Sequence, residues 1–273
     1  MESSSNRGNV CISMIWKDKE WILPYTLRML TLLNYPKEKI GIRFVVMPVS
    51  FHDQKDETFR SLMNFKRVFF KLYRFISVWT VNTGNTRTEK PSNGNKRNGD
   101  WNMQLSKNLL MDAVSKKDEY VFYVDSSVLL EENSLNHLIN LDKDVVAGLC
   151  LNQDYINIGQ YDPNMNSFDN SFDYKKIISD GVPTKVAFVS DMMLFRYWIS
   201  KKIKFYQSNK LTSSEDDGAM RDMMKNNIDR WFEPKALGSI MFNEKELDDF
   251  VKKTNIDPLI LPDLLPEHRL ISA

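Results

Sequence analysis

A carboxylate and two hydroxyl groups follow one of the most apolar segments of the chain. The run Tyr120–Val124 (YVFYV) is typical of a buried strand, and Asp125, Ser126 and Ser127 come directly after it. A carboxylate at the end of a buried strand needs a cation, backbone donors or water, because burying it without a partner is costly. Oxygen ligands of this kind suit Mg²⁺ or Mn²⁺ carrying a diphosphate. The alternative is that Asp125 and Ser126 only cap the turn into the next segment.

Three consecutive acids open a predicted helix further along the chain. Ser213 stands at the N-cap position, and Glu215, Asp216 and Asp217 follow in the first turn, where the helix dipole stabilises each negative charge by about 0.3–1 kcal/mol. Capping therefore accounts for some of these acids, but three adjacent carboxylates repel one another more than a cap requires. A carboxylate held by backbone N–H groups at a helix start stays ionised and fixed, as a general base for a hydroxyl group must be.

Strands and helices alternate around these two motifs. Apolar runs predict strands at 10–15, 40–49, 77–81, 120–124, 145–150 and 186–189, and a last extended piece starting at 231–232. Helical periodicity predicts helices at 23–33, 65–76, 101–114, 135–139 and 213–226, whereas the polar segment 152–180 has no clear pattern. This alternation predicts an α/β domain with a mostly parallel sheet covered on both faces, and ligands beyond the carboxyl ends of its strands.

One predicted helix, 65–76, has an apolar face bordered by basic residues. The apolar positions are Phe65, Val68, Phe69, Leu72, Phe75 and Ile76, and the basic ones are Lys66, Arg67, Lys71 and Arg74. The simpler interpretation is an amphipathic core helix with a solvated basic rim. The alternative is a patch that docks on an anionic membrane.

The composition limits the classes of function. With 37 Lys and Arg against 36 Asp and Glu, the chain lacks the basic field of nucleic-acid-binding proteins, so we expect no nucleic-acid partner. Two cysteines, Cys11 and Cys150, lie in apolar runs and favour a reducing compartment. No run reaches 18 apolar residues and the polar start has no secretion signal, so we expect a cytoplasmic protein.

Four segments of the sequence resemble GT-A glycosyltransferases, in the family's order, over residues 10–242. They are the strand, Leu-rich helix and YPK turn of 10–46, then YVFYVDSSVLLEENSLNHLI, KVAFVSDMMLFRYWI and SSEDDGAMRDMM. The resemblance is closest to the collagen galactosyltransferase and lysyl-hydroxylase glycosyltransferase domains and to the family 2 enzymes. It implies a GT-A (Rossmann-like) fold, with a mostly parallel mixed sheet flanked by helices, over 1–245. A C-terminal helix and Pro-containing tail would follow at 246–273.

The same resemblance implies an activity. Such enzymes transfer a sugar from a nucleotide-diphosphate sugar, here a UDP- or GDP-sugar, to a hydroxyl of a glycan or protein acceptor. In this reading the polar segment 82–100 is either a lid that closes over the donor or a plain surface insertion. A compact domain of this kind would suit a microbial or viral enzyme.

The resemblance also assigns the donor-side residues. Asp125 matches the first Asp of the family's D-x-D motif, which contacts the nucleotide ribose and helps to hold Mn²⁺ or Mg²⁺. Ser127 stands where the second Asp would be, which implies metal binding that is weak, water-mediated or absent. His268 is the only late histidine that could be a further metal ligand. The other expected contacts with the nucleotide sugar are Trp16, Lys17, Asp53, Lys107 and Ser126.

On the acceptor side, Asp216 matches the usual catalytic base of the family, with Glu215 beside it, and Asp191 lies in the segment that resembles the acceptor-side strand. Two rival interpretations stay open. One is a GT-A-like module that has lost catalysis, suggested by Ser127 and by the absence of a histidine near 240–241. The other is a nucleotide-dependent scaffold that docks on a membrane through 65–76.

Overall fold

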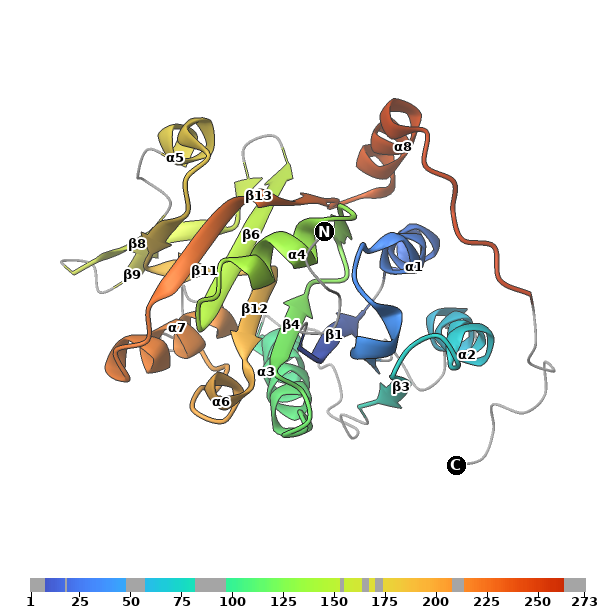
Figure 1. The fold of residues 1–273 in the computed structure, drawn as a ribbon, viewed down its shortest axis with the longest axis horizontal. Coiled ribbons are helices and arrows are strands. Elements are labelled where there is room, and N and C mark those ends of the chain that lie inside the picture. Colours follow the sequence, from blue (N-terminus) through green and yellow to red (C-terminus); the bar gives the residue numbers. More distant parts are fainter. Residues whose placement is uncertain are drawn as a thin grey trace.

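One mixed sheet forms the centre of the molecule (Figure 1). The computed structural model describes residues 8–17, 19–47, 57–81, 97–152, 155–163, 167–169, 174–207 and 214–262. Within them the strand order is β10 (Thr184–Val186), β13 (Arg230–Ile240), β6 (Val145–Asn152), β12 (Met192–Arg196), β4 (Tyr120–Val124), β1 (Val10–Trp16), β2 (Ile40–Val46) and β3 (Phe75–Thr80). Two short strands lie off this path, β5 (Val128–Leu130) beside β13 and β7 (Tyr155–Ile156) beside β6.

The long strands run parallel with one exception. β3, β2, β1 and β4 pair in parallel, as do β6 and β13, while β12 lies antiparallel between β4 and β6. The expected α/β class with a mostly parallel sheet is therefore confirmed. Because β12 runs the opposite way, its first residues lie at the same edge of the sheet as the last residues of β4.

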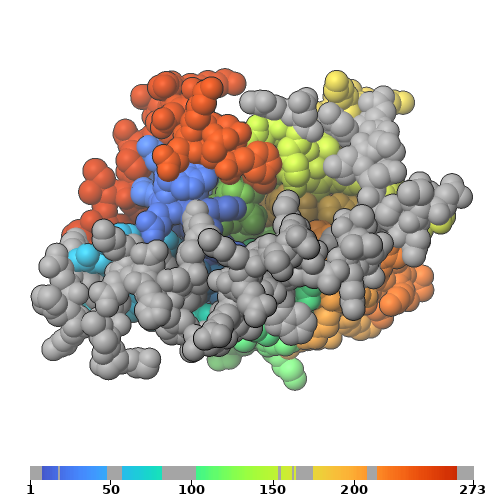
Figure 2. Space-filling model, turned by 180° about the vertical axis from the view of Figure 1, so that it is seen from behind, coloured from blue at the N-terminus to red at the C-terminus, as the bar shows by residue number. Residues whose placement is uncertain are grey.

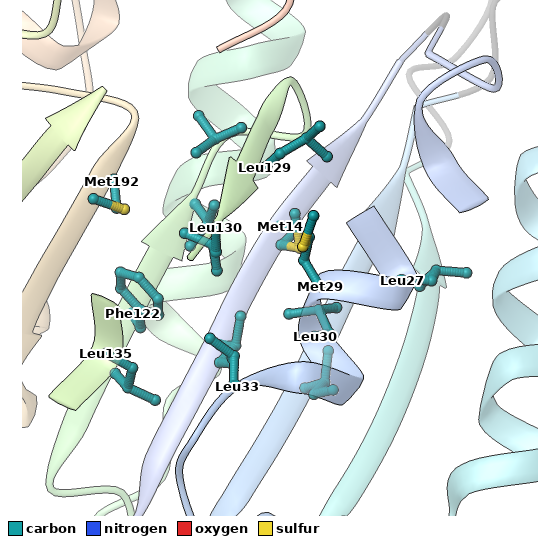
Figure 3. Packing of buried hydrophobic residues seen from close by; sticks show 14 of the residues in the cluster. Met14, Leu27, Met29, Leu30, Leu33, Phe122, Leu129, Leu130, Leu135 and Met192 are labelled. Carbon is teal, nitrogen blue, oxygen red and sulfur yellow. The ribbon is translucent and has the colours of Figure 1, made fainter. Parts of the chain in front are cut away.

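Helices cover both faces of the sheet. One face carries α1 (Leu23–Leu32), α2 (Glu57–Phe69), α4 (Ser134–Asn140) and α8 (Glu244–Thr254), and the other carries α3 (Arg97–Asp112), α6 (Tyr197–Ser200) and α7 (Glu215–Lys225). Alternate residues of one strand serve the two faces, since Phe122 belongs to the first core and Tyr123 to the second. Figure 3 shows Leu30 of α1 and Leu33, which directly follows this helix, in the first core.

The polar segment 152–180 is more ordered than its sequence predicts. It contains β7, β8 (Ile158–Asp162), β9 (Ser167–Asp169) and α5 (Tyr174–Asp180). β8 lies between β9 and β11 (Phe188–Val189) in a separate three-stranded sheet. The predicted single strand 186–189 is accordingly two strands in different sheets. Strands of two to five residues are too short to show a periodicity, and pairing between distant segments stabilises them.

The predicted helix 65–76 is wrong in its second half. α2 ends at Phe69, and Phe75 and Ile76 begin β3, where they pair with Gly41 and Ile42 of β2. A Cβ on Gly41 would lie 2.2 Å from the ring of Phe75, so the glycine makes room for this pairing. The apolar spacing suits a helix in isolation, but the edge of β2 takes these residues into the sheet.

Several other boundaries differ from expectation. A 3₁₀ turn, Lys37–Lys39, precedes β2, and α3 begins at Arg97, inside the segment predicted as a loop. The remainder of that loop, 82–96, lies outside the described residues, and so does the proposal that it acts as a lid.

The C-terminal segment returns to the first face of the sheet. Asn243 caps α8 by accepting a hydrogen bond from the backbone N–H of Glu246, and Leu247 is buried in the same core as α1. The chain then reaches α1, where the N–H of Leu259 donates to the carbonyl of Pro24 at 3.1 Å. Figure 2 shows the red C-terminal segment against the blue residues of α1. The predicted division at 245/246 stays a prediction.

None of the described helices combines the length and the apolar character needed to cross a bilayer.

Candidate active site

Three elements bring polar residues to the carboxyl edge of the central sheet. Lys19 follows β1, Asp125 follows β4, and Asp191 precedes the antiparallel β12. The backbone N–H of Asp125 donates to the carbonyl of Asp191 at 2.7 Å, which fixes the two residues side by side. In open α/β sheets this edge is where ligands bind.

The carboxylate of Asp125 accepts three hydrogen bonds on one oxygen. Lys19 Nζ lies 2.9 Å from Oδ1, the backbone N–H of Ser127 lies 2.8 Å from it, and the Ser127 hydroxyl also donates to it. Burial raises the pKa of Asp125, but the Lys19 charge and the Ser127 donors outweigh it and hold the pKa below its ordinary value. The N–H of Val128 donates to the carbonyl of Asp125, so the turn expected as the alternative is present and orients the carboxylate.

The described residues do not fit a divalent ion at Asp125. No three His, Cys, Asp or Glu side chains among them are grouped closely enough to hold a metal. The hydroxyl of Ser127 donates to Asp125, and Lys19 already places a positive charge on the carboxylate. His268, the expected late ligand, lies outside the described residues.

A buried lysine joins the two acids at the start of α7. Lys107 Nζ of α3 lies 2.7 Å from Asp216 Oδ1 and 2.8 Å from Glu215 Oε1, and the Lys107 side chain is only 5% exposed. The ammonium also lies 5.0 Å from the ring centre of Tyr123 and 5.3 Å from that of Phe205. The charges of Asp216, Tyr123 and Glu215 overcome the effect of burial and hold the pKa of Lys107 well above its ordinary value.

The same surroundings shift the pKa of Asp216 in the direction that suits a base near neutral pH. Burial raises it, the Lys107 charge opposes this rise, and the neighbouring Glu215 charge adds to it. The result is a pKa of about 7 for Asp216. A raised pKa brings the carboxyl group closer to neutral pH, where proton transfer by a general base is most effective.

Asp125 and Asp216 belong to one electrostatic neighbourhood. The negative charge of Asp125 contributes to the raised pKa of Asp191, and the charge of Asp191 contributes to that of Asp216. The negative charges of Asp125 and Asp216 both raise the pKa of the Tyr123 phenol. Two acids 91 positions apart in the sequence therefore act on the same small region.

A hydroxyl network holds Asp191 in place. The Tyr155 hydroxyl and the Ser190 hydroxyl both donate to Asp191 Oδ2, the second at 3.0 Å. Asp191 itself has a φ of 59°, a left-handed conformation that is uncommon outside glycine and that is often found at functional sites. Phe242 packs edge-on against Tyr155, with 5.4 Å between ring centres, and its side chain is 55% exposed.

The other expected site residues have different surroundings. Trp16 is fully buried in the first core and Ser126 is also buried. Lys17 is partly exposed directly after β1. Lys107 contacts Asp216 and Glu215, so the structure places its charge beside the expected base. Asp53 lies outside the described residues.

Sequence reasoning missed two residues of the site. Lys19 had a signal, because it belongs to the charged cluster directly after β1. Tyr155 had none, because it lies in a polar segment without periodicity. Its role depends on the pairing of β7 with β6.

Comparisons with known proteins bear on this geometry. Residues 7–220 match the family model described as glycosyltransferase family 25, N-terminal domain, and this range includes both Asp125 and Asp216. No curated protein matches the chain.

Solved structures of S. aureus TarS have a similar fold. The 1–349 fragment has a TM-score of 0.53 at 16% identity, covering 89% of this chain and 62% of that one. Another TarS structure has a TM-score of 0.54 at 14% identity, with 90% of this chain and 38% of that chain covered. The fragment in complex with UDP-GlcNAc has a TM-score of 0.54 at 14% identity, with 86% and 59% covered. The chain therefore spans less than two thirds of the length of each of these structures.

Proposed function

The chain belongs to the family of glycosyltransferase family 25 N-terminal domains, and from this premise we propose that it transfers a sugar from a nucleoside diphosphate sugar to a hydroxyl of an acceptor. One observation carries the proposal. Asp125, paired with Lys19 at 2.9 Å, follows β4, and Lys107, which lies 2.7 Å from Asp216 at the start of α7, lies 5.0 Å from the ring of Tyr123 on that same strand.

We assign the donor to the Asp125 side of the site. Asp125 has a lowered pKa, so it is ionised at neutral pH and is able to accept a hydrogen bond from a ribose hydroxyl. The Lys19 ammonium faces the negative charge of the diphosphate. A similar fold has been solved with UDP-GlcNAc, which makes UDP-sugars the first donors to test, followed by GDP-sugars.

We assign the base to Asp216. The ionised carboxylate takes the proton of the acceptor hydroxyl while the acceptor oxygen forms a bond to the anomeric carbon. The bond from that carbon to the β-phosphate oxygen breaks, and its electron pair leaves with the nucleoside diphosphate. A base in the correct position contributes about 10²–10⁴-fold to the rate. Lys107 is a positioning residue in this scheme, because it orients Asp216 and opposes the effect of burial on its pKa.

The acceptor belongs on the side of Asp191. Its carboxylate is oriented by Tyr155 and Ser190, and the exposed ring of Phe242 lies next to Tyr155. An exposed aromatic ring beside a carboxylate suits a glycan, whose apolar faces pack on rings and whose hydroxyls donate to acids. A hydroxyl-bearing protein side chain is the second acceptor class.

Hydrolysis of a panel of nucleotide sugars tests this function without knowledge of the acceptor. UDP- and GDP-sugars are incubated with the protein, and release of nucleoside diphosphate is followed over time. We expect slow release from one donor, reduced at least tenfold in Asp216→Asn. No release from any donor, together with no binding of UDP or GDP, would contradict the proposal and favour a module without catalysis.

One surface feature supports an additional membrane contact. Val68, Phe70 and Leu72 are 41%, 55% and 46% exposed, and Lys66, Arg67 and Lys71 adjoin them in sequence at the end of α2. Apolar side chains among cations favour the surface of anionic bilayers. Flotation with phosphatidylserine vesicles tests this contact. The Lys66→Gln/Arg67→Gln/Lys71→Gln variant should remain in the lower fractions. If it floats as well as the unmodified protein, these three residues do not mediate membrane binding.

A further inference from the structure

The Asp125 carboxylate is already neutralised by a side chain of this chain. Its Oδ1 accepts from Lys19 Nζ and from the backbone and side chain of Ser127. A divalent ion would need lone pairs of the same carboxylate, and it would also lie against the Lys19 ammonium. A divalent cation and an ammonium bound to the same carboxylate repel each other, so they do not bind it together.

A second carboxylate beside Asp125, that of Asp191, also accepts hydrogen bonds. Asp191 Oδ2 accepts from the hydroxyls of Tyr155 and Ser190. Ser127 supplies a neutral hydroxyl, which acts here as a donor. Around Asp125 Oδ1 the described residues thus place three donors, one of them an ammonium, where a metal ion would need a free acceptor oxygen.

The charges indicate what Lys19 does. Two carboxylates and a divalent cation sum to zero, and one carboxylate and one ammonium also sum to zero. Replacing an acid by Ser127 and an ion by Lys19 therefore leaves the net charge of the site unchanged. The Lys19 side chain is 29% exposed, and its ammonium has three donors, of which Asp125 takes one. Among the described residues only Asp125 accepts from this ammonium, which leaves two donors for phosphate oxygens, and lysine binds these as a point charge.

We propose that Lys19 takes the place of the divalent ion, so that this chain binds the diphosphate of its donor without a metal. This inference rests on the proposed function, since it concerns the same donor site.

Calorimetry with UDP and GDP tests it, each titrated once with EDTA and once with Mn²⁺. We expect the dissociation constant of the preferred nucleotide to agree within about threefold in the two buffers. With EDTA, Lys19→Met should raise it about 10–100-fold, the range expected for loss of a charged hydrogen bond. The matched control is Lys185→Met, which removes another lysine–aspartate pair, with Asp229, and should leave it unchanged.

A double variant reverses the exchange of charges. Lys19→Ala/Ser127→Asp has two carboxylates and no ammonium, so we expect it to bind the nucleotide at least tenfold more tightly with Mn²⁺ than with EDTA. Circular dichroism of each variant confirms that it is folded.

The outcomes separate this inference from the proposed function. Nucleotide binding that requires Mn²⁺ in the unmodified protein, or that is unaffected by Lys19→Met in EDTA, would overturn the inference alone. Absence of nucleotide binding in both buffers would overturn the inference and the proposed function together.

Discussion

Two lysine–carboxylate pairs lie at the same edge of the sheet and differ in burial. The Lys107 side chain is 5% exposed and contacts Asp216 and Glu215, whereas Lys19 and Asp125 are 29% and 24% exposed. The carboxyl group of the buried pair has a raised pKa and that of the half-buried pair a lowered one. The comparison indicates that burial determines the role for which each pair is suited. The buried lysine sets the pKa of a base, whereas the accessible lysine can bind a ligand as well as its own carboxylate.

The largest expected effect is on turnover. Asp216→Asn keeps the size of the side chain but removes the base, so donor hydrolysis should fall about 10²–10⁴-fold while the affinity for nucleoside diphosphate changes less than about threefold. Asp217→Asn is the matched control, because it removes the adjacent charge, which pairs with Arg221. If Asp216→Asn retains turnover, the base is another residue. The two lysine–carboxylate pairs would then no longer differ in function as proposed.

The second effect is on stability. Lys107→Met leaves two buried carboxylates without their cation, which should lower the free energy of unfolding by about 3–5 kcal/mol. Lys19→Met, in the accessible pair, should cost about 1 kcal/mol or less. Urea unfolding measures both. The loss of unfolding free energy in Lys107→Met should be smaller at pH 5 than at pH 8, because protonation neutralises the two carboxylates. Equal losses in the two variants would show that burial does not distinguish the pairs.

The third effect is on donor affinity. Asp125→Ala removes the ionised group assigned to the ribose, and we expect the dissociation constant of the preferred nucleoside diphosphate to rise about tenfold. Asp229→Ala, at the exposed pair with Lys185, is the control and should have no effect. Unchanged affinity in Asp125→Ala would mean that this carboxylate only caps the turn before β5.

The smallest effect is a shift of a pH profile. Because ionised Asp216 is the active form, kcat/KM for donor hydrolysis should rise with pH through an apparent pKa of about 7. The Glu215 charge raises this pKa, so Glu215→Gln should move the rising limb to lower pH. If the rising limb stays in place or moves to higher pH in Glu215→Gln, the pH dependence of kcat/KM does not report the ionisation of Asp216.

The central strands were predictable because they are buried on both faces. The predicted 120–124 coincides with β4, and the predicted 145–150 is extended by two residues in β6. Such strands have continuous apolar runs that do not depend on their neighbours. The edge strand β3 was predicted in part, because the predicted strand 77–81 overlaps it while Phe75 and Ile76 were assigned to the helix before it. The accessory strand β8 was not predicted, because it depends on pairing with β11 further along the chain.

The site was predictable to the same extent. The sequence by itself determined that Asp125 follows a buried strand and that Asp216 lies in the first turn of a helix, because apolar runs and acids in a first helical turn act locally. The N-cap residue is Ser214 and not the expected Ser213, and its side chain makes no capping hydrogen bond. Only the tertiary structure decided that Lys19 reaches Asp125 across 106 positions and that Lys107 reaches Asp216 across 109. Those distances close because β1 lies beside β4 and α3 packs near α7. The order of strands in a sheet depends on the packing of the whole core, so it cannot be predicted from a local sequence pattern.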